Sequence, residues 1–173
     1  FPWHATTTTI LRMVTTSVGL GLMVRTGAAR SRVSLGQDQI RSLAGEVQVT
    51  RENRPFVHYR LGTRPVGEGA DVLLSSLAVA PDVKGYGGPI NLGMLVRGDG
   101  TIGTLRVLQS RETPGYVKGM GRWLQASFEG RHIGRDFVLG KDPRDGTGDD
   151  HSVDALTGAT ITSRAVVATV NRT

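Results

Sequence analysis

The sequence predicts an α+β fold, an antiparallel β-sheet packed with helices, preceded by an N-terminal membrane-anchor-like helix. Three observations predict it: a β-hairpin pattern in the middle of the 173-residue chain, an amphipathic helical stripe after it, and an apolar segment near the start. The length suits one domain, or one domain with an appendage. The hydrophobic fraction, 38%, is enough for a buried core.

Residues 1–29 are predicted to form a membrane anchor or a signal-like segment. Ala5 to Val24 carries a single charge, Arg12, and its length suits a bilayer crossing, although its threonines weaken its hydropathy. Arg12 lies near one end, where its side chain can reach the headgroups. An uncleaved secretory signal and an ordinary amphipathic helix stay open as alternatives. Three arginines after the segment favour a cytoplasmic flank: Arg25, Arg30 and Arg32.

Residues 30–50 are predicted to form a connector helix, and residues 51–173 the folded domain. Two strand candidates open this domain, at Phe56 to Leu61 and Ala70 to Ala80. The hairpin follows, with strands over Pro89 to Val96 and Thr101 to Gln109 joined by a turn at Asp99-Gly100. Alternation predicts that four side chains share the face that covers the core: Ile90, Leu92, Met94 and Val96.

Helical spacing follows the hairpin. Five apolar residues form one stripe: Tyr116, Met120, Trp123, Leu124 and Phe128. Glycines weaken the first turns of this helix, so a late start is expected. Lys141 to Asp150 is a charged, glycine-rich loop, and Thr162 to Val170 is predicted to form a packed C-terminal helix.

Composition excludes several classes of function. The 21 basic residues outnumber the 15 acidic ones, but they are scattered and lack interleaved aromatics, so no nucleic-acid partner is expected. The absence of cysteine excludes disulfides, thiolate zinc sites and iron–sulfur clusters. The histidines lack metal-ligand spacing, so no metal site is predicted. No residue looks like a catalytic base beside a substrate pocket, so no catalytic residue is assigned.

Two short stretches carry the functional argument. The first is Glu112-Thr113-Pro114-Gly115-Tyr116, directly after the returning strand, and the second runs from Asp154 to Ser163. Considered alone, the first is a turn and the second a helix start.

Together with Gly85-Tyr86-Gly87-Gly88-Pro89-Ile90, the Asp99-Gly100 turn and Trp123, the two stretches resemble the FMN-binding domain family. This family occurs in subunits of the Rnf complex, of the sodium-pumping NADH:quinone reductase and of related membrane redox proteins. The resemblance runs from about Gly85 to Val170. It implies FMN bound covalently to Thr160 through a phosphoester, attached by a dedicated flavin transferase.

The resemblance also implies roles for the neighbouring residues. Thr157, where the family usually has serine, Gly158 and Ala159 complete the attachment core, and Asp154 is similar to the acidic residue that opens the transferase recognition motif. The loop against the isoalloxazine ring is matched by Glu112, Thr113, Pro114 and Gly115.

Physical chemistry is consistent with a phosphate at Thr160. The phosphate would lie at the start of a helix, where unpaired backbone N–H groups and the helix dipole favour an anion. Hydroxyl groups are available nearby on Thr157, Thr162 and Ser163. Gly158 and Ala159 leave the backbone open to the phosphate and to a modifying enzyme.

The predicted function is therefore an electron relay inside a membrane-associated redox complex, rather than a stand-alone enzyme. Its partners would be other subunits of the complex, because one flavin without cysteine needs electron carriers on other chains. The resemblance implies a bacterial inner-membrane protein with its soluble domain on the periplasmic face, which conflicts with the arginines after the anchor. An accessory subunit that keeps the fold without redox use, and a soluble flavoprotein reductase, stay open as alternatives.

Overall fold

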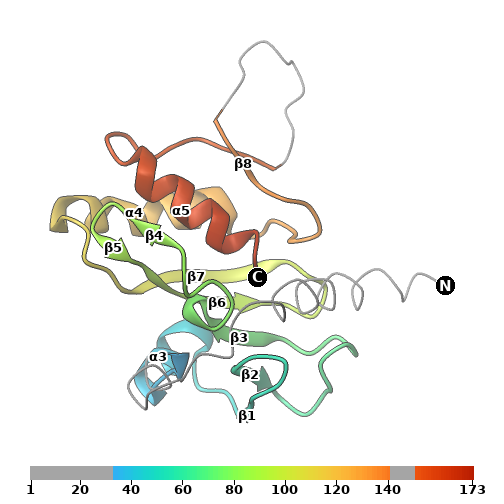
Figure 1. Cartoon of the computed structure of the whole chain (residues 1–173). Helices are drawn as coiled ribbons and strands as arrows, with labels where there is room; N and C mark the ends of the chain where they lie inside the picture. The colour runs from blue at the N-terminus through green and yellow to red at the C-terminus, as the bar shows by residue number, and fades with distance from the viewer. Residues whose placement is uncertain (1–32, 141–150) are drawn as a thin grey trace.

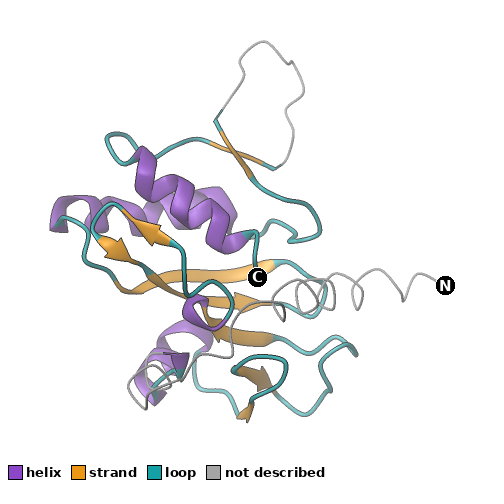
Figure 2. Ribbon diagram, in the orientation of Figure 1, coloured by secondary structure: helices purple, strands orange, loops and turns teal. Residues whose placement is uncertain are grey.

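The computed structural model describes residues 33–140 and 151–173 of the chain. Within them, a five-stranded antiparallel sheet lies between helix α3 (Gln37–Ala44) on one face and helices α4 (Pro114–Phe128) and α5 (Thr160–Val170) on the other (Figures 1 and 2). The predicted antiparallel α+β architecture is confirmed. The predicted anchor and the predicted loop at residues 141–150 lie outside the described residues. No helix in the described ranges is both long and apolar enough to cross a bilayer.

The strands of the sheet follow the order β1-β2-β3-β6-β7, and every neighbouring pair is antiparallel. Their bounds are Val49–Glu52, His58–Leu61, Val72–Ser75, Asn91–Val96 and Ile102–Gln109. The last two strands are the predicted hairpin, with Met94 opposite Leu105. In the turn, the Asp99 carboxylate accepts a hydrogen bond from the backbone N–H of Thr101 at 2.9 Å. The hairpin prediction is confirmed.

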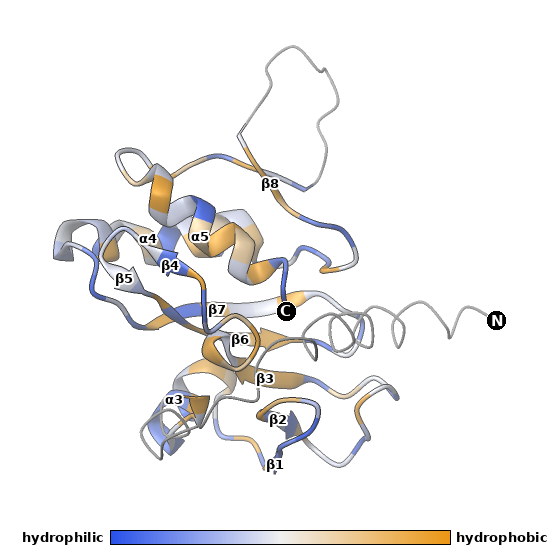
Figure 3. Cartoon of the chain, in the orientation of Figure 1, coloured by the Kyte–Doolittle hydropathy of each residue, from blue (hydrophilic) through white to orange (hydrophobic). Residues whose placement is uncertain are grey.

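Strand β6 is buried on both faces and lies at the centre of the core (Figure 3). Its predicted core face is confirmed: Ile90, Leu92, Met94 and Val96 are all buried against α4 and α5. The opposite face packs against α3, where Leu43 lies so close to Gly93 that a side chain on this glycine would collide with it. The sequence predicted that the first face is buried, but it did not predict burial of the second.

Strand β3 is shorter than predicted, because serine hydroxyls bind the backbone beyond its end. Ser75 Oγ accepts a hydrogen bond from the N–H of Leu77 at 3.3 Å, and the 3-10 helix η1 (Ser76–Ala78) follows. Ser76 Oγ accepts from the N–H of Leu92 at 2.9 Å. These bonds turn the chain out of the extended conformation and tie the turn to β6.

The helix predicted between residues 30 and 50 is observed as α3, which is shorter than predicted. It ends at Ala44 and is followed by Gly45, whose positive φ of 75° glycine adopts without strain. Strand β1 begins at Val49, so the predicted connector also contains the first strand residues. The division of the chain at residues 29 and 50 stays a prediction.

Helix α4 begins at Pro114, so the predicted late start is wrong. Proline suits the first helical position, because its missing N–H has no intrahelical partner there. Three residues of the predicted stripe are fully buried: Met120, Leu124 and Phe128. Tyr116 is 40% exposed and lies outside this buried stripe.

Two short strand pairs flank helix α5. Strand β4 (Lys84–Gly85) pairs with β5 (Gly88–Pro89), and β8 (Val138–Leu139) pairs in parallel with β9 (Ser152–Val153). At the end of α5, the Asn171 side chain pairs with both backbone groups of Phe137. Its Nδ2 donates to the carbonyl at 2.9 Å, and its Oδ1 accepts from the N–H at 2.8 Å. The end of the helix is thereby fastened to the chain that leads into β8.

Candidate functional site

Thr160 is the first residue of helix α5, and it is exposed. The residue before it, Ala159, occupies the N-cap position, where its side chain can accept no hydrogen bond. The first intrahelical bond runs from the N–H of Ser163 to the Ala159 carbonyl at 2.8 Å, which leaves the preceding N–H groups of the first turn without an intrahelical acceptor. The helix therefore offers an exposed hydroxyl beside unpaired donors, in the positive field of its dipole.

The segment before α5 is held in place by Ser163. Its Oγ accepts a hydrogen bond from the N–H of Leu156 at 2.9 Å and donates to the Ala159 carbonyl at 3.0 Å. Gly158 adopts a φ of 76°, which lets the chain turn sharply into the helix. Ser163 thus fixes the position of the segment that leads into α5.

The predicted phosphate donors lie in different environments. Thr157 is exposed next to Gly158, three residues before Thr160. Thr162 and Ser163 are 2% and 1% exposed, and the single O–H of Ser163 already donates to a carbonyl. The burial of these two residues gives no support to their predicted role as phosphate donors.

Glu112, the first residue of the other predicted stretch, is buried and joins two parts of the site. Its Oε1 accepts a hydrogen bond from the N–H of Gly87 at 2.8 Å, which fastens the β4–β5 turn to the chain before α4. The sequence predicted a loop over Glu112, Thr113, Pro114 and Gly115. This prediction is wrong for Pro114 and Gly115, which lie in the first turn of α4 after the N-cap residue Thr113.

The structure brings the two stretches together. A Cβ added to Gly158 would lie 3.3 Å from the Tyr116 hydroxyl. Farther along α4, Trp123 Nε1 donates a hydrogen bond to the Asp154 carbonyl at 2.8 Å. Figure 1 shows the β4–β5 hairpin and the beginnings of α4 and α5 at the same end of the molecule. The predicted site residues thus come from neighbouring elements, and Asp154 and Thr157 lie exposed beside them.

Exposed apolar side chains gather at this end. Of the six large hydrophobic residues exposed in the described ranges, three come from the elements that meet here: Tyr86, Tyr116 and Ile161, at 79%, 40% and 55% exposure. Sequence reasoning gave none of them a role in binding. The available signal was an aromatic residue inside a glycine-rich turn, which does not by itself indicate a binding site.

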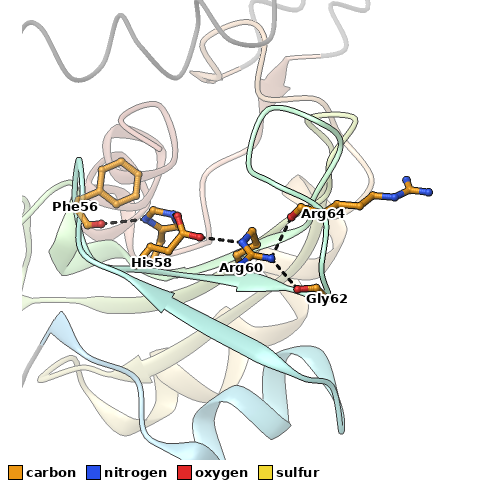
Figure 4. Close-up of polar contacts among 6 residues, drawn as sticks. Phe56, His58, Arg60, Gly62 and Arg64 are labelled. Atoms are coloured by element: carbon orange, nitrogen blue, oxygen red, sulfur yellow. Dashed lines mark hydrogen bonds and ion pairs between the residues drawn. The ribbon is translucent and has the colours of Figure 1, made fainter.

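Away from this end of the molecule, a cluster of polar side chains lies between β1 and β2 (Figure 4). Buried His58 contacts the Phe56 carbonyl through Nδ1 at 3.0 Å and the Glu52 carboxylate through Nε2 at 3.2 Å. Arg60 Nε donates to the same carboxylate at 2.8 Å, and this hydrogen bond is the main cause that lowers the pKa of Glu52. The cluster binds its own strands together, and the described residues contain no group of ligands suited to a metal ion.

The fold and the open start of α5 define a domain that presents an exposed threonine hydroxyl at a helix N-terminus. The model of the FMN-binding domain family matches residues 85–173, and the chain belongs to this family. The match begins at the β4–β5 hairpin and includes both predicted stretches. The resemblance inferred from the sequence is confirmed.

Two curated relatives are similar over part of their length. One is the G subunit of the ion-translocating oxidoreductase complex of Cereibacter sphaeroides, 43% identical over 51% of this chain and 40% of the relative. The other is the G subunit of the Na(+)-translocating ferredoxin:NAD(+) oxidoreductase complex of Acetobacterium woodii, 30% identical over 73% of this chain and 52% of the relative. The chain spans about half the length of the curated relatives it matches.

Among solved structures, the crystal structure of Shewanella oneidensis NqrC is similar at 24% sequence identity and a TM-score of 0.42. The similarity covers 66% of this chain and 53% of that one.

Proposed function

We propose that this chain carries FMN through a phosphoester on Thr160 and relays electrons inside a membrane-associated redox complex. The observation that carries the proposal is the exposed Thr160 hydroxyl at the uncapped start of α5, within a chain of the FMN-binding domain family. When bound, the flavin supplies the electron chemistry, and the protein supplies position and electrostatics.

The residues at the start of α5 suit an attached phosphate. The phosphate oxygens would accept hydrogen bonds from backbone N–H groups of the first turn, in place of a capping side chain. The exposed Thr157 hydroxyl is a further donor, and Gly158 adds no side chain that would block a modifying enzyme. Forming the ester joins the Thr160 oxygen to the phosphorus of an activated flavin phosphate, and releases the hydroxyl proton and the donor's leaving group. A flavin transferase would recognise the motif that begins at Asp154.

The partners in this proposal are the other members of the complex. Both relatives described above are named as subunits of oxidoreductase complexes, which supports a carrier role in place of independent turnover. We propose that residues 1–29 anchor the chain in the bacterial inner membrane, with the FMN-binding domain on the periplasmic face. Protease accessibility in intact spheroplasts tests this orientation, since a cytoplasmic domain would be protected.

The attachment is tested by intact-mass spectrometry of the chain produced together with the transferase. The parent chain should gain the mass of one FMN moiety, and Thr160→Ala should lose this gain completely. Thr160→Ser, which keeps a hydroxyl, is the matched control and should retain some modification. Flavin fluorescence in the denatured band provides an independent readout. An unmodified parent chain, obtained while the same cells modify another substrate of the transferase, would contradict the proposal.

Electron transfer is tested separately on the modified protein. The bound flavin should reduce and reoxidise reversibly, and it should do so with its partner subunits faster than free FMN does. A flavin that stays oxidised while the assembled complex turns over would instead favour an accessory subunit.

A further inference from the structure

The β4–β5 hairpin is a rigid support for one exposed aromatic ring. Gly87 donates its N–H to the buried Glu112 carboxylate at 2.8 Å. Neither Gly85 nor Gly87 has room for a side chain, because an added Cβ would collide with Glu112 in the first case and with the Arg111 carbonyl in the second. Tyr86 lies between these two tightly packed glycines and is nevertheless 79% exposed. The turn is packed closely, while its largest side chain extends into solvent.

The path of the chain places Tyr86 near the start of α5. Arg172, just beyond the end of α5, contacts Asp82 at 2.6 Å, and the chain then runs beside the helix through β4. Four extended residues cover at most about 13 Å, which corresponds to about nine residues of helix. Tyr86 therefore lies no farther along α5 than about the level of Ser163, and Figure 1 shows the β4–β5 turn at the end of the molecule where α5 begins.

The contacts of the β4–β5 hairpin with the chain before α4 also place the hairpin near the start of α5. The hairpin touches Arg111 and Glu112, which directly precede helix α4. In the first turn of α4, Tyr116 lies beside Gly158, two residues before Thr160. Ile161, exposed at 55%, follows Thr160 directly. Three exposed hydrophobic side chains thus come from separate elements that meet at the end where Thr160 lies, whereas isolated exposed hydrophobics are usually scattered over a surface.

We infer that Tyr86 packs against the isoalloxazine ring of the FMN at Thr160, with Tyr116 and Ile161 completing the apolar surroundings. This inference rests on the proposed function. A flat tricycle with broad aromatic faces suits these exposed hydrophobic side chains, because aromatic rings gain from offset stacking and from the burial of their faces. A fixed turn adds to this, since Tyr86 gives up little backbone freedom when the ring binds.

The inference is tested on full-length protein whose FMN content has been verified by mass. A stacked phenol quenches flavin fluorescence by donating an electron to the excited ring. Tyr86→Leu should therefore raise the fluorescence yield per flavin several-fold and make the flavin more accessible to iodide. Tyr86→Phe should also raise the yield but keep the protection from iodide. Val138→Ala, at a residue that is 61% exposed outside the site, is the control and should change neither quantity.

Each other outcome counts against the inference. If Tyr86→Leu remains folded and modified but leaves fluorescence and iodide accessibility unchanged, Tyr86 does not contact the ring. Weaker binding of partner subunits in that variant would then assign Tyr86 to a docking surface. A parent chain without FMN contradicts the proposed function itself, whereas a modified parent with an insensitive Tyr86 contradicts only this inference.

Discussion

At the scale of single residues, glycine decides how closely the segments of the site approach one another. Gly87 packs against the backbone of Arg111, and Gly158 turns the chain beside Tyr116. Gly121, on α4, has open space where a side chain would lie. The same residue type therefore permits a close approach in the turn and only adds flexibility in the helix.

Substituting these glycines should have opposite effects on stability. Gly87→Ala forces a methyl group against a carbonyl and should lower the free energy of unfolding by about 1–3 kcal/mol. Gly121→Ala, the matched control, should raise it by up to about 1 kcal/mol, because alanine favours the helix. Urea denaturation followed by circular dichroism measures both. Equal effects of the two substitutions would mean that the turn is not tightly packed.

The family resemblance, carried by the Thr-Gly-Ala-Thr core, singled out Thr160 as a candidate site residue. The structure places Thr160 exposed at the start of α5, two residues before the predicted helix start at Thr162. The contact between Glu112 and Gly87 was not predictable, because it joins residues distant in sequence and depends on how two turns pack. Pro114 and Gly115 were interpreted as a loop, yet proline fits a helix start equally well.

At the scale of elements, the β1–β2 pair is held by a charged side-chain network. Glu52, on β1, accepts one hydrogen bond from Arg60 and contacts His58, both on β2. The Arg60 hydrogen bond, followed by the charges of His58 and Arg60, lowers the pKa of Glu52 below the ordinary value of 4.5 despite some desolvation. The carboxylate is therefore more acidic in the folded chain than in the unfolded one.

This difference predicts a pH dependence of stability. As the pH falls, Glu52 takes up a proton at a higher pH in the unfolded chain than in the folded one. The ionised Glu52 therefore contributes fully to the free energy of unfolding above about pH 4.5. This contribution is lost as the pH falls through the lower pKa of the folded state. Glu52→Gln should thus be less stable than the parent at pH 7, with a gap that narrows as the pH falls from 5 toward 2. The effect is modest because the side chain is 36% exposed. Urea midpoints across this range measure the gap, and a constant gap would contradict the assignment.

Secondary structure was predictable wherever local pattern and packing agree. The alternation in β6 predicted the buried face, and the helical spacing predicted α4 with three of its buried residues. Strand β3 was overestimated because Ser75 and Ser76 divert the backbone through their hydroxyls. The apolar content of the segment alone does not reveal that the strand ends at these serines.

At the scale of the whole molecule, the sheet separates two hydrophobic clusters. The larger one lies under α4 and α5, and the smaller one joins α3 to β2 and β3 through Leu43, Tyr59 and Leu73. Tyr59 also holds the chain before α3, because its hydroxyl accepts a hydrogen bond from the N–H of Leu35 at 2.9 Å. The residues predicted to form a connector thus pack on the sheet.

Shortening the Leu43 side chain of α3 should therefore destabilise the entire sheet. Leu43→Ala should lower the free energy of unfolding by about 2–5 kcal/mol, while the transition stays a single one. Exposed Val138→Ala is the control and should stay within about 0.5 kcal/mol of the parent. Tryptophan fluorescence, measured with Trp3→Phe in both proteins so that it comes from Trp123 on the far side of the sheet, reports whether the two clusters unfold together. A second transition, or an unchanged midpoint, would make α3 an independent appendage.

Helix α5 is fastened at the end opposite Thr160. The Asn171 amide grips both backbone groups of Phe137, and Arg172 reaches Asp82. Because these bonds hold its C-terminal end and one of its faces is buried, α5 is held firmly against the rest of the domain. A redox group bound to Thr160 would therefore move little relative to the domain. The electron-tunnelling distance to a neighbouring carrier would then depend mainly on how whole subunits dock, and little on local fluctuation.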